Sequence, residues 1–111
     1  MSITGTLSAA ISGLNADSVR VNVAAHNIAN ARTAEFQPLQ VTAKTLTTQQ
    51  NTTTDYASGG VLVSVSPTLG EGVNMVREIT NMMQAHVSYK ANASLIRHVE
   101  DMAKTVIDIK A

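Results

Sequence analysis

The sequence predicts a mainly α-helical protein. Two long antiparallel terminal helices should form a coiled-coil-like pair, with a small β-hairpin or extended segment between them. Apolar residues recur with a helical period in the first and last parts of the 111 residues, whereas the middle is rich in threonine and glycine. Only 3% of the residues are aromatic and none is cysteine, so aliphatic side chains must form the core without disulfides. We divide this one structural unit into an N-terminal helix (1–33), a connection (34–72) and a C-terminal helix (73–111).

The first helix is expected over residues 3–31. Apolar side chains recur there every seven residues, at Leu7, Leu14, Val21 and Ile28. The complementary positions hold Ile3, Ala10 and Ala24, with Asp17 as an exception. This is the a/d pattern of a coiled coil, and Ser2 or Thr4 is available to cap its start. Gly13 costs roughly 1 kcal/mol relative to alanine inside a helix, which predicts a packing reason for it.

The last helix is expected over residues 73–109. One apolar stripe consists of Met75, Ile79, Met82, Tyr89, Ala93 and Ile96. A second, shifted stripe consists of Leu95, Val99, Met102, Val106 and Ile109. The shift indicates that the apolar face wraps around the helix. Three i,i+4 charge pairs, Arg97/Asp101, Glu100/Lys104 and Lys104/Asp108, should each add about 0.2–0.5 kcal/mol.

The connection contains the signals of a short hairpin. Val61, Val63 and Val65 alternate with other residues, after Gly59-Gly60 and before Pro67. This pattern predicts a strand, whose partner is expected around residues 39–46. Seven threonines fall within residues 42–54, a composition that favours extended or disordered chain over helix. Gly70 and Gly72 should form the turn into the last helix.

Helices of this length cannot bury all their apolar surface alone. The C-terminal helix, of about 37 residues, would be about 55 Å long, whereas a compact domain of this size has a radius of gyration of about 13 Å. The second stripe and the alanine-rich back of the first helix therefore need partners, most simply copies or relatives of the same chain. We infer an elongated subunit that is completed by assembly. The alternative is a compact bundle in which both helices break.

Charge and hydropathy exclude several classes of partner. Eight basic residues balance eight acidic ones, without a basic cluster, so no nucleic-acid partner is expected. The longest uncharged apolar run is far below the 18 residues of a membrane span, so no direct membrane insertion is expected. The first basic residue is Arg20, unlike the basic start of a secretory signal, so we do not expect that route if the protein leaves the cytoplasm.

No catalytic, cofactor or metal site is expected. His86 and His98 lie about 120° apart around a helix, and His26 is far away in the sequence, whereas a catalytic zinc site needs about three convergent ligands. Glu78 has Asn81 and Met82 at i+3 and i+4. It therefore lacks the partner that a general base would need and is expected to be an interface or surface charge.

Two segments of the chain resemble a known family. Residues 20–31, RVNVAAHNIANA, are similar to the N-terminal signature R-x-N-V-x-A-x-N-[IL]-A-N-A of bacterial flagellar rod and hook axial proteins. The C-terminal part resembles the family's V-D-x-x-x-E-M-x-N-M…S-Y-x-A-N motif. The matching positions there are Val73, Glu78, Asn81, Met83, Ala85, Ser88, Tyr89, Ala91 and Asn92. The short insert, with Ala57-Ser58-Gly59-Gly60-Val61, looks like that of the proximal rod subunit.

The chain departs from the family pattern at three places. Residues 33–36 stand where the family usually has a Pro-Gly-like turn, and Asn74 replaces the usual aspartate. A polar segment that is common before the last helix is absent, since only residues 67–71 connect strand and helix. The resemblance therefore leaves two alternatives, the proximal rod subunit itself and a shortened paralogue.

The resemblance implies a non-enzymatic structural subunit of the flagellar basal-body rod. Such subunits are exported by the flagellar type III apparatus and assemble in the periplasm with copies of themselves and other rod proteins. Their terminal helices pack into a helical tube that transmits torque from the motor to the hook. A soluble helical adaptor or an export chaperone that binds another helix remains the alternative, because it would use the same apolar stripes.

We expect an assembly interface along both helices. Asn22 and Asn27 are candidates for hydrogen bonds between subunits, whereas capping of the helix end would also explain Asn30. Asp17 either pairs with Arg20 or faces a neighbouring subunit. The full candidate set is Leu7, Leu14, Val21, Asn22, Asn27, Ile28, Asn30, Glu78, Met82, Tyr89, Asn92, Ile96, Val99, Met102 and Val106.

Overall fold

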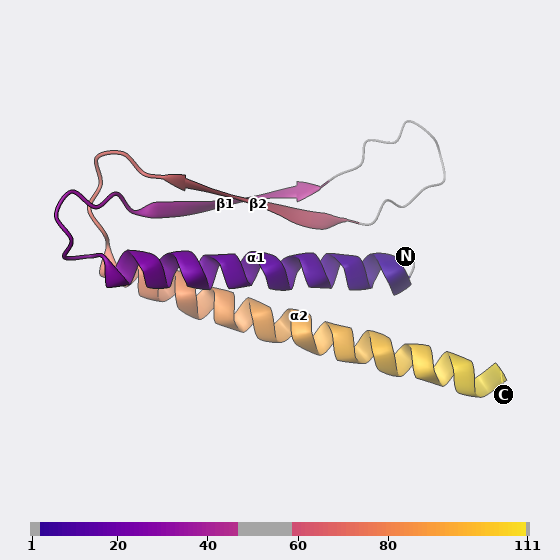
Figure 1. Cartoon of the computed structure of the whole chain (residues 1–111). Coiled ribbons are helices and arrows are strands. Elements are labelled where there is room, and N and C mark those ends of the chain that lie inside the picture. The colour runs from indigo at the N-terminus through magenta and orange to yellow at the C-terminus, as the bar shows by residue number, and fades with distance from the viewer. Residues whose placement is uncertain (1–2, 47–58, 111) are drawn as a thin grey trace.

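The computed structural model describes residues 3–46 and 59–110 and shows two long helices and a hairpin (Figure 1). In chain order the elements are α1 (Ile3–Ala29), β1 (Leu39–Leu46), β2 (Gly60–Pro67) and α2 (Met75–Lys110). The two helices run antiparallel, and the hairpin and α2 pack against different sides of α1. The predicted fold class is confirmed.

The molecule is long and thin. Its extents are 63 × 34 × 14 Å and its radius of gyration is 18.3 Å, compared with about 13 Å for a compact domain of this size. The shortest extent is close to the diameter of one helix with its side chains, about 10–12 Å. The subunit is therefore little more than one element thick, and the compact alternative with broken helices is wrong.

Both helices differ by two residues from their expected bounds, because asparagines cap them. α1 ends at Ala29 rather than residue 31: the backbone N–H of Asn30 and its side-chain Nδ2 both donate to His26 O, at 3.1 and 3.0 Å. α2 begins at Met75 rather than residue 73, because Asn74 precedes it as the N-cap. Thr4 lies inside α1 and is not its cap, and Ser2 lies outside the described residues.

The hairpin has the expected strands. β1 and β2 pair antiparallel, from Leu39 opposite Pro67 to Leu46 opposite Gly60. The half-buried valines of β2, Val61 and Val63, share one face with Val41 of β1. Of the threonine-rich segment, residues 42–46 lie in β1, and residues 47–54 lie outside the described residues.

The contact between the helices consists mainly of small side chains. The most buried apolar residues are Ala10, Ala16, Ala24, Ala85 and Val99. Two lines with a spacing of seven residues follow the helix pair: Ala10, Asp17 and Ala24 on α1, and Glu78, Ala85, Asn92 and Val99 on α2. Alanine lets two backbones approach closely, so larger side chains are displaced to the flanks of the contact.

This arrangement corrects the expected stripes. The heptad residues of α1, Leu7, Leu14, Val21 and Ile28, are only half-buried. In the first stripe expected on α2, Met75, Ile79 and Tyr89 are exposed. The three i,i+4 charge pairs on α2 are not closed, since none of them is within ion-pair distance in the described part of the chain.

Candidate assembly surface

A polar network crosses the two helices at mid-length. The Asp17 carboxylate is 1% exposed, yet both oxygens have donors. Oδ1 accepts from Arg20 Nη1 at 3.1 Å, and Oδ2 accepts from Asn92 Nδ2 of α2 at 3.3 Å. The expected pairing of Asp17 with Arg20 is confirmed. The contact with Asn92 links two positions that are 75 residues apart, so this network fixes how the helices are aligned.

Gly13 gives this network its space. A Cβ added at Gly13 would lie 2.6 Å from Asn92 Nδ2 and 3.1 Å from Asn92 Cγ. Both distances are shorter than van der Waals contact, so the side chain of Asn92 occupies the volume that any other residue at position 13 would need. The packing reason expected for Gly13 is confirmed.

Asn27 holds the start of β1 on α1. Its side chain is fully buried, Nδ2 donates to Leu39 O, and Oδ1 accepts from Leu39 N, both at 2.8 Å. The side-chain amide of Asn27 thus makes the two hydrogen bonds to Leu39 that the backbone of a neighbouring strand would otherwise make. Each half of the Asn27 amide has a partner within the chain, and hydrogen bonding of Asn27 between subunits stays a prediction.

Ser12 holds the start of β2 in a similar way. Its Oγ donates to Ala9 O at 2.8 Å and accepts from Val61 N at 3.1 Å. Asn27 and Ser12 therefore fix the hairpin at its two ends. Asn27 contacts β1 at one end of the hairpin and Ser12 contacts β2 at the other, so the hairpin is twisted, and its strands cross in the view of Figure 1.

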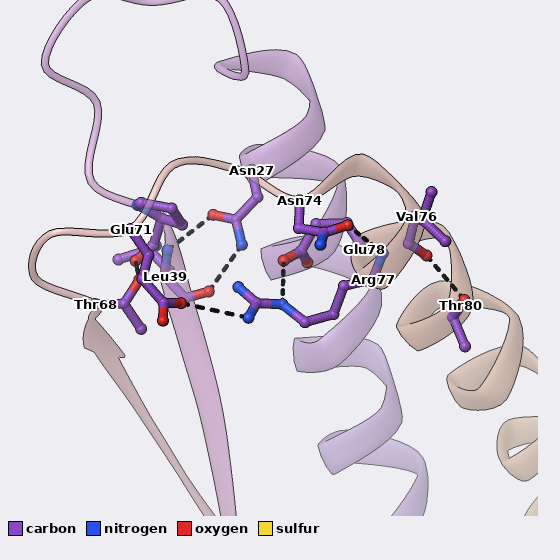
Figure 2. A network of polar contacts seen from close by, with 10 residues as sticks. Asn27, Leu39, Thr68, Glu71, Asn74, Val76, Arg77, Glu78 and Thr80 are labelled. Atoms are coloured by element: carbon purple, nitrogen blue, oxygen red, sulfur yellow. Dashed lines mark hydrogen bonds and ion pairs between the residues drawn. The ribbon is translucent and has the colours of Figure 1, made fainter.

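A charged cluster surrounds the first turn of α2 (Figure 2). Arg77 Nη1 lies 3.5 Å from Glu71 Oε2, and Arg77 Nε lies 3.8 Å from Glu78 Oε1. Asn74 Oδ1 accepts from Arg77 N at 3.0 Å, which satisfies one free N–H of the first turn. Glu78 is 4% exposed, and its negative charge at a helix N-terminus is favourable.

Beside this cluster, α1, β1 and α2 enclose a groove of about 470 Å³. Its lining includes Arg20, Val41, Arg77, Glu78 and Gln84. Within the described ranges no group of three or more acidic, histidine or cysteine residues is placed to hold a metal ion. The groove therefore offers charged and amide groups for polar contacts.

The side of α2 opposite α1 carries an exposed apolar stripe. Its members recur at helical spacing: Val76 (74% exposed), Ile79 (46%), Met83 (65%) and Val87 (67%). At 100° per residue, this stripe lies opposite the buried line that contains Ala85. Contiguous exposed apolar residues of this kind mark interaction sites.

The end of α2 extends beyond α1. Counting ten residues back from Gly13 reaches the start of α1 at Ile3, and ten residues on from Asn92 is Met102. Beyond this level α2 has no α1 beside it, and Val106 and Ile109 are 61% and 81% exposed. In the second stripe of α2, Val99 is buried against α1, whereas Met102, Val106 and Ile109 after it are exposed.

The structure divides the expected interface residues into three groups. Those buried within the chain are Asn27, Glu78 and Val99. Those half-buried are Leu7, Leu14, Val21, Ile28, Asn30, Met82, Asn92 and Ile96. Those exposed are Asn22, Tyr89, Met102 and Val106. The assembly role stays a prediction for the whole set; within the chain, Asn30 acts as a helix cap and Asn92 contacts α1.

Sequence reasoning missed the contribution of Val76, Met83 and Val87. Their spacing is as helical as that of the expected stripes, but apolar residues occur on several sides of α2, and periodicity alone cannot tell which side α1 covers. It also missed Ser12, because a serine that binds a strand 49 residues away leaves no local signal.

A thin molecule with uncovered apolar helices has the form expected of a structural building block. Comparison with known families agrees with this class. Residues 69–109 match the family described as Flagellar basal body rod FlgEFG protein C-terminal, and residues 7–37 match the family described as Flagella basal body rod protein. Together these segments cover about two thirds of the chain. The chain belongs to the flagellar basal-body rod protein family. No curated protein sequence matches it, and none of the described helices is long and apolar enough to cross a membrane.

Proposed function

We propose that this flagellar basal-body rod protein is a structural subunit that assembles through its two terminal helices into a helical tube, which transmits torque from the motor to the hook. The observation that carries the proposal is the uncovered surface of α2. Val76, Met83 and Val87 on one side are between 65% and 74% exposed, and Ile109 at the free end is 81% exposed. Burying these side chains against neighbouring subunits would contribute about 25 cal/mol for each Å² of apolar surface.

The shape of the subunit supports a role in carrying load. α2 has 36 residues without a break, which corresponds to about 54 Å of continuous helix. The subunit is only 14 Å thick, so neighbours can pack on both of its broad faces. Long helices packed side by side resist torsion in a way that a string of separate domains does not.

The proposed partners follow from family membership. They are copies of this chain, other rod proteins, and the flagellar type III apparatus that would export the chain without a cleaved signal peptide. The proposed location is the periplasmic rod of the basal body. The proposed role requires no enzymatic activity and no cofactor, since packing alone performs it.

Charged substitutions on the exposed stripe test the proposal directly. Met83→Glu and Val87→Glu change exposed side chains, so the dilute subunit should keep its helicity, while a buried charge should prevent assembly. Ala34→Glu is the matched control, because it adds the same charge at an exposed position of the turn between α1 and β1, away from the stripe. Sedimentation, electron microscopy at high concentration and motility of cells carrying each variant are the measurements. Full assembly and motility of Met83→Glu and Val87→Glu would contradict the proposal.

Ile28→Asp tests α1. Ile28 is half-buried, and a charge there should block assembly without abolishing expression; normal motility of cells with only this variant would refute the role assigned to α1. Stoichiometry separates the adaptor or chaperone alternative from the rod subunit. A chaperone forms a discrete small oligomer, whereas a rod subunit forms filaments or requires rod neighbours.

A further inference from the structure

The hydrogen bonds of the hairpin identify its unpaired backbone groups. In an antiparallel pair, residues alternate between those bonded to the opposite strand and those whose N–H and C=O point away from it. Leu39 points away, because both of its backbone groups bond to Asn27. By alternation, Val41, Ala43 and Thr45 point toward the same outer edge of β1.

The same reasoning applies to β2. Thr45 lies opposite Val61, so Val61 must also point outward, and its N–H does bond to Ser12 rather than to β1. Val63 and Val65 follow by alternation, and Pro67 at the end of the strand has no N–H. The two side-chain bonds thus give independent and consistent assignments of the outward groups.

Only part of each outer edge is closed by α1. Asn27 closes β1 at Leu39 and Ser12 closes β2 at Val61, and the twist of the hairpin carries the rest of each edge away from α1 (Figure 1). The outward groups of Ala43, Thr45, Val63 and Val65 bond to nothing else in the described part of the chain. An isolated two-stranded hairpin is marginally stable, and open strand edges invite pairing with another chain.

These two open edge segments fit each other. We propose that the β1 edge of one subunit pairs antiparallel with the β2 edge of a second copy, so that hairpins join into a continuous sheet in the assembly; this inference rests on the proposed rod function. The register follows from the groups that are available. Placing Ala43 opposite Val65 of the second copy, and Thr45 opposite Val63 of the second copy, uses all four open positions. Val41 lines the groove between α1, β1 and α2 and is left out of the pairing, opposite Pro67 of the second copy, which has no N–H. A shift of two residues one way would place Thr45 opposite Val61, whose N–H Ser12 already occupies, and a shift the other way would place Ala43 opposite Pro67.

This pairing is heterologous, because a different strand is used on each side of the contact. Heterologous contacts propagate into rings or helical filaments instead of ending at a dimer. The pairing also places exposed apolar side chains of the hairpin, Leu46 (51%), Leu62 (57%) and Val65 (46%), next to neighbouring subunits. The hairpin would then join adjacent subunits in addition to the helices.

Cysteine cross-linking tests the register, and the chain has no cysteine of its own. In the proposed pairing Lys44 lies opposite Ser64 of the second copy, in a non-hydrogen-bonded pair with Cα atoms about 4.5 Å apart, which is within the range for a disulfide. Subunits carrying K44C are mixed with subunits carrying S64C, assembled and oxidised. We expect the mixed disulfide as the main product, and no mixed disulfide when S18C on α1 replaces K44C.

A proline substitution tests the same edge without cross-linking. Ala43→Pro removes one outward N–H at an exposed position, where proline is tolerated at a sheet edge. The helicity and melting temperature of the dilute subunit should therefore not change, while association should weaken about tenfold for each interface. Ala43→Thr, which keeps the N–H, should assemble like the unchanged chain.

The possible results separate this inference from the proposed function. Sedimenting assemblies without the mixed disulfide, with protein that carries Ala43→Pro assembling normally, would overturn the strand pairing and leave the rod function intact. A predominant K44C homodimer would show β1 pairing with β1 and would also overturn it. A chain that forms no assembly, alone or with rod proteins, would overturn both.

Discussion

Gly13→Ala should destabilise the subunit, although alanine is the better helix former. The substitution alone would gain about 1 kcal/mol in a helix interior. The new Cβ, however, would lie 2.6 Å from Asn92 Nδ2, so the Asn92 side chain must rotate away. It then loses its hydrogen bond to Asp17 Oδ2. A hydrogen bond to a charged group contributes about 1.5–3 kcal/mol, so we expect a net loss of about 0.5–2 kcal/mol.

A double-mutant cycle isolates this contact. In the Asn92→Ala background the obstacle is gone, and Gly13→Ala should then stabilise the subunit by about 1 kcal/mol. The sign of the effect therefore reverses between the two backgrounds. Urea unfolding followed by circular dichroism, at a concentration where the chain is monomeric, measures all four free energies of unfolding. Asn15→Ala, at an exposed position of α1, reports the effect of helix propensity without the contact.

One result would refute this reasoning. If Gly13→Ala stabilised the unchanged chain by as much as it stabilises the Asn92→Ala chain, then Asn92 would not lie over Gly13, and the alignment of the two helices would differ from the structure.

Substitutions at three further positions test the caps and turns. Asn27→Asp keeps the acceptor for Leu39 N but loses the donor to Leu39 O. It should lower the free energy of unfolding by about 1–3 kcal/mol and speed amide hydrogen exchange at Leu39. Unchanged exchange at Leu39 would contradict the role of the Asn27 amide. Asn74→Ala should cost about 1 kcal/mol in thermal unfolding, whereas Asn74→Asp should be nearly neutral because aspartate also caps the N–H of Arg77. Glu35 has φ 59°, a left-handed conformation that costs a side-chain-bearing residue about 1–2 kcal/mol. Glu35→Gly should therefore raise the free energy of unfolding in urea by about 0.5–1 kcal/mol, after the greater backbone entropy of glycine is subtracted. A lower free energy of unfolding would count against that conformation.

The sequence predicted those features that local patterns determine. Alternating valines and the flanking Gly59-Gly60 and Pro67 identified β2, because a strand has a period of two and a proline ends it, and β1 lies where its partner was expected. Two of the three departures from the family pattern also have local explanations. Asn74 is an N-cap like the aspartate that it replaces, and Glu35 adopts the positive φ that a glycine in the usual turn would adopt easily.

The contacts between distant segments could not be predicted in the same way. Leu7, Leu14, Val21 and Ile28 form the clearer heptad pattern, yet the line with Ala10, Asp17 and Ala24 is the more buried one. A periodic pattern shows that a helix has an apolar side, but the closest approach of two backbones is decided by small residues on both helices together. The hydrogen bonds of Asn27 within the chain were missed for a related reason, since its partner Leu39 is reached only through the turn between them.

The polar residues within the helix contact determine how much of α2 remains free. A contact line made of alanine alone would allow one helix to slide along the other by a heptad with little loss, whereas a buried polar pair allows only one alignment. Asp17 and Asn92 supply that pair. A slip of seven residues would move the end of α2 by about 10 Å relative to α1, which would cover or expose the segment with Val106 and Ile109. A buried carboxylate is a poor source of stability, but here it sets the length of uncovered helix that would be available to a neighbour in the proposed assembly.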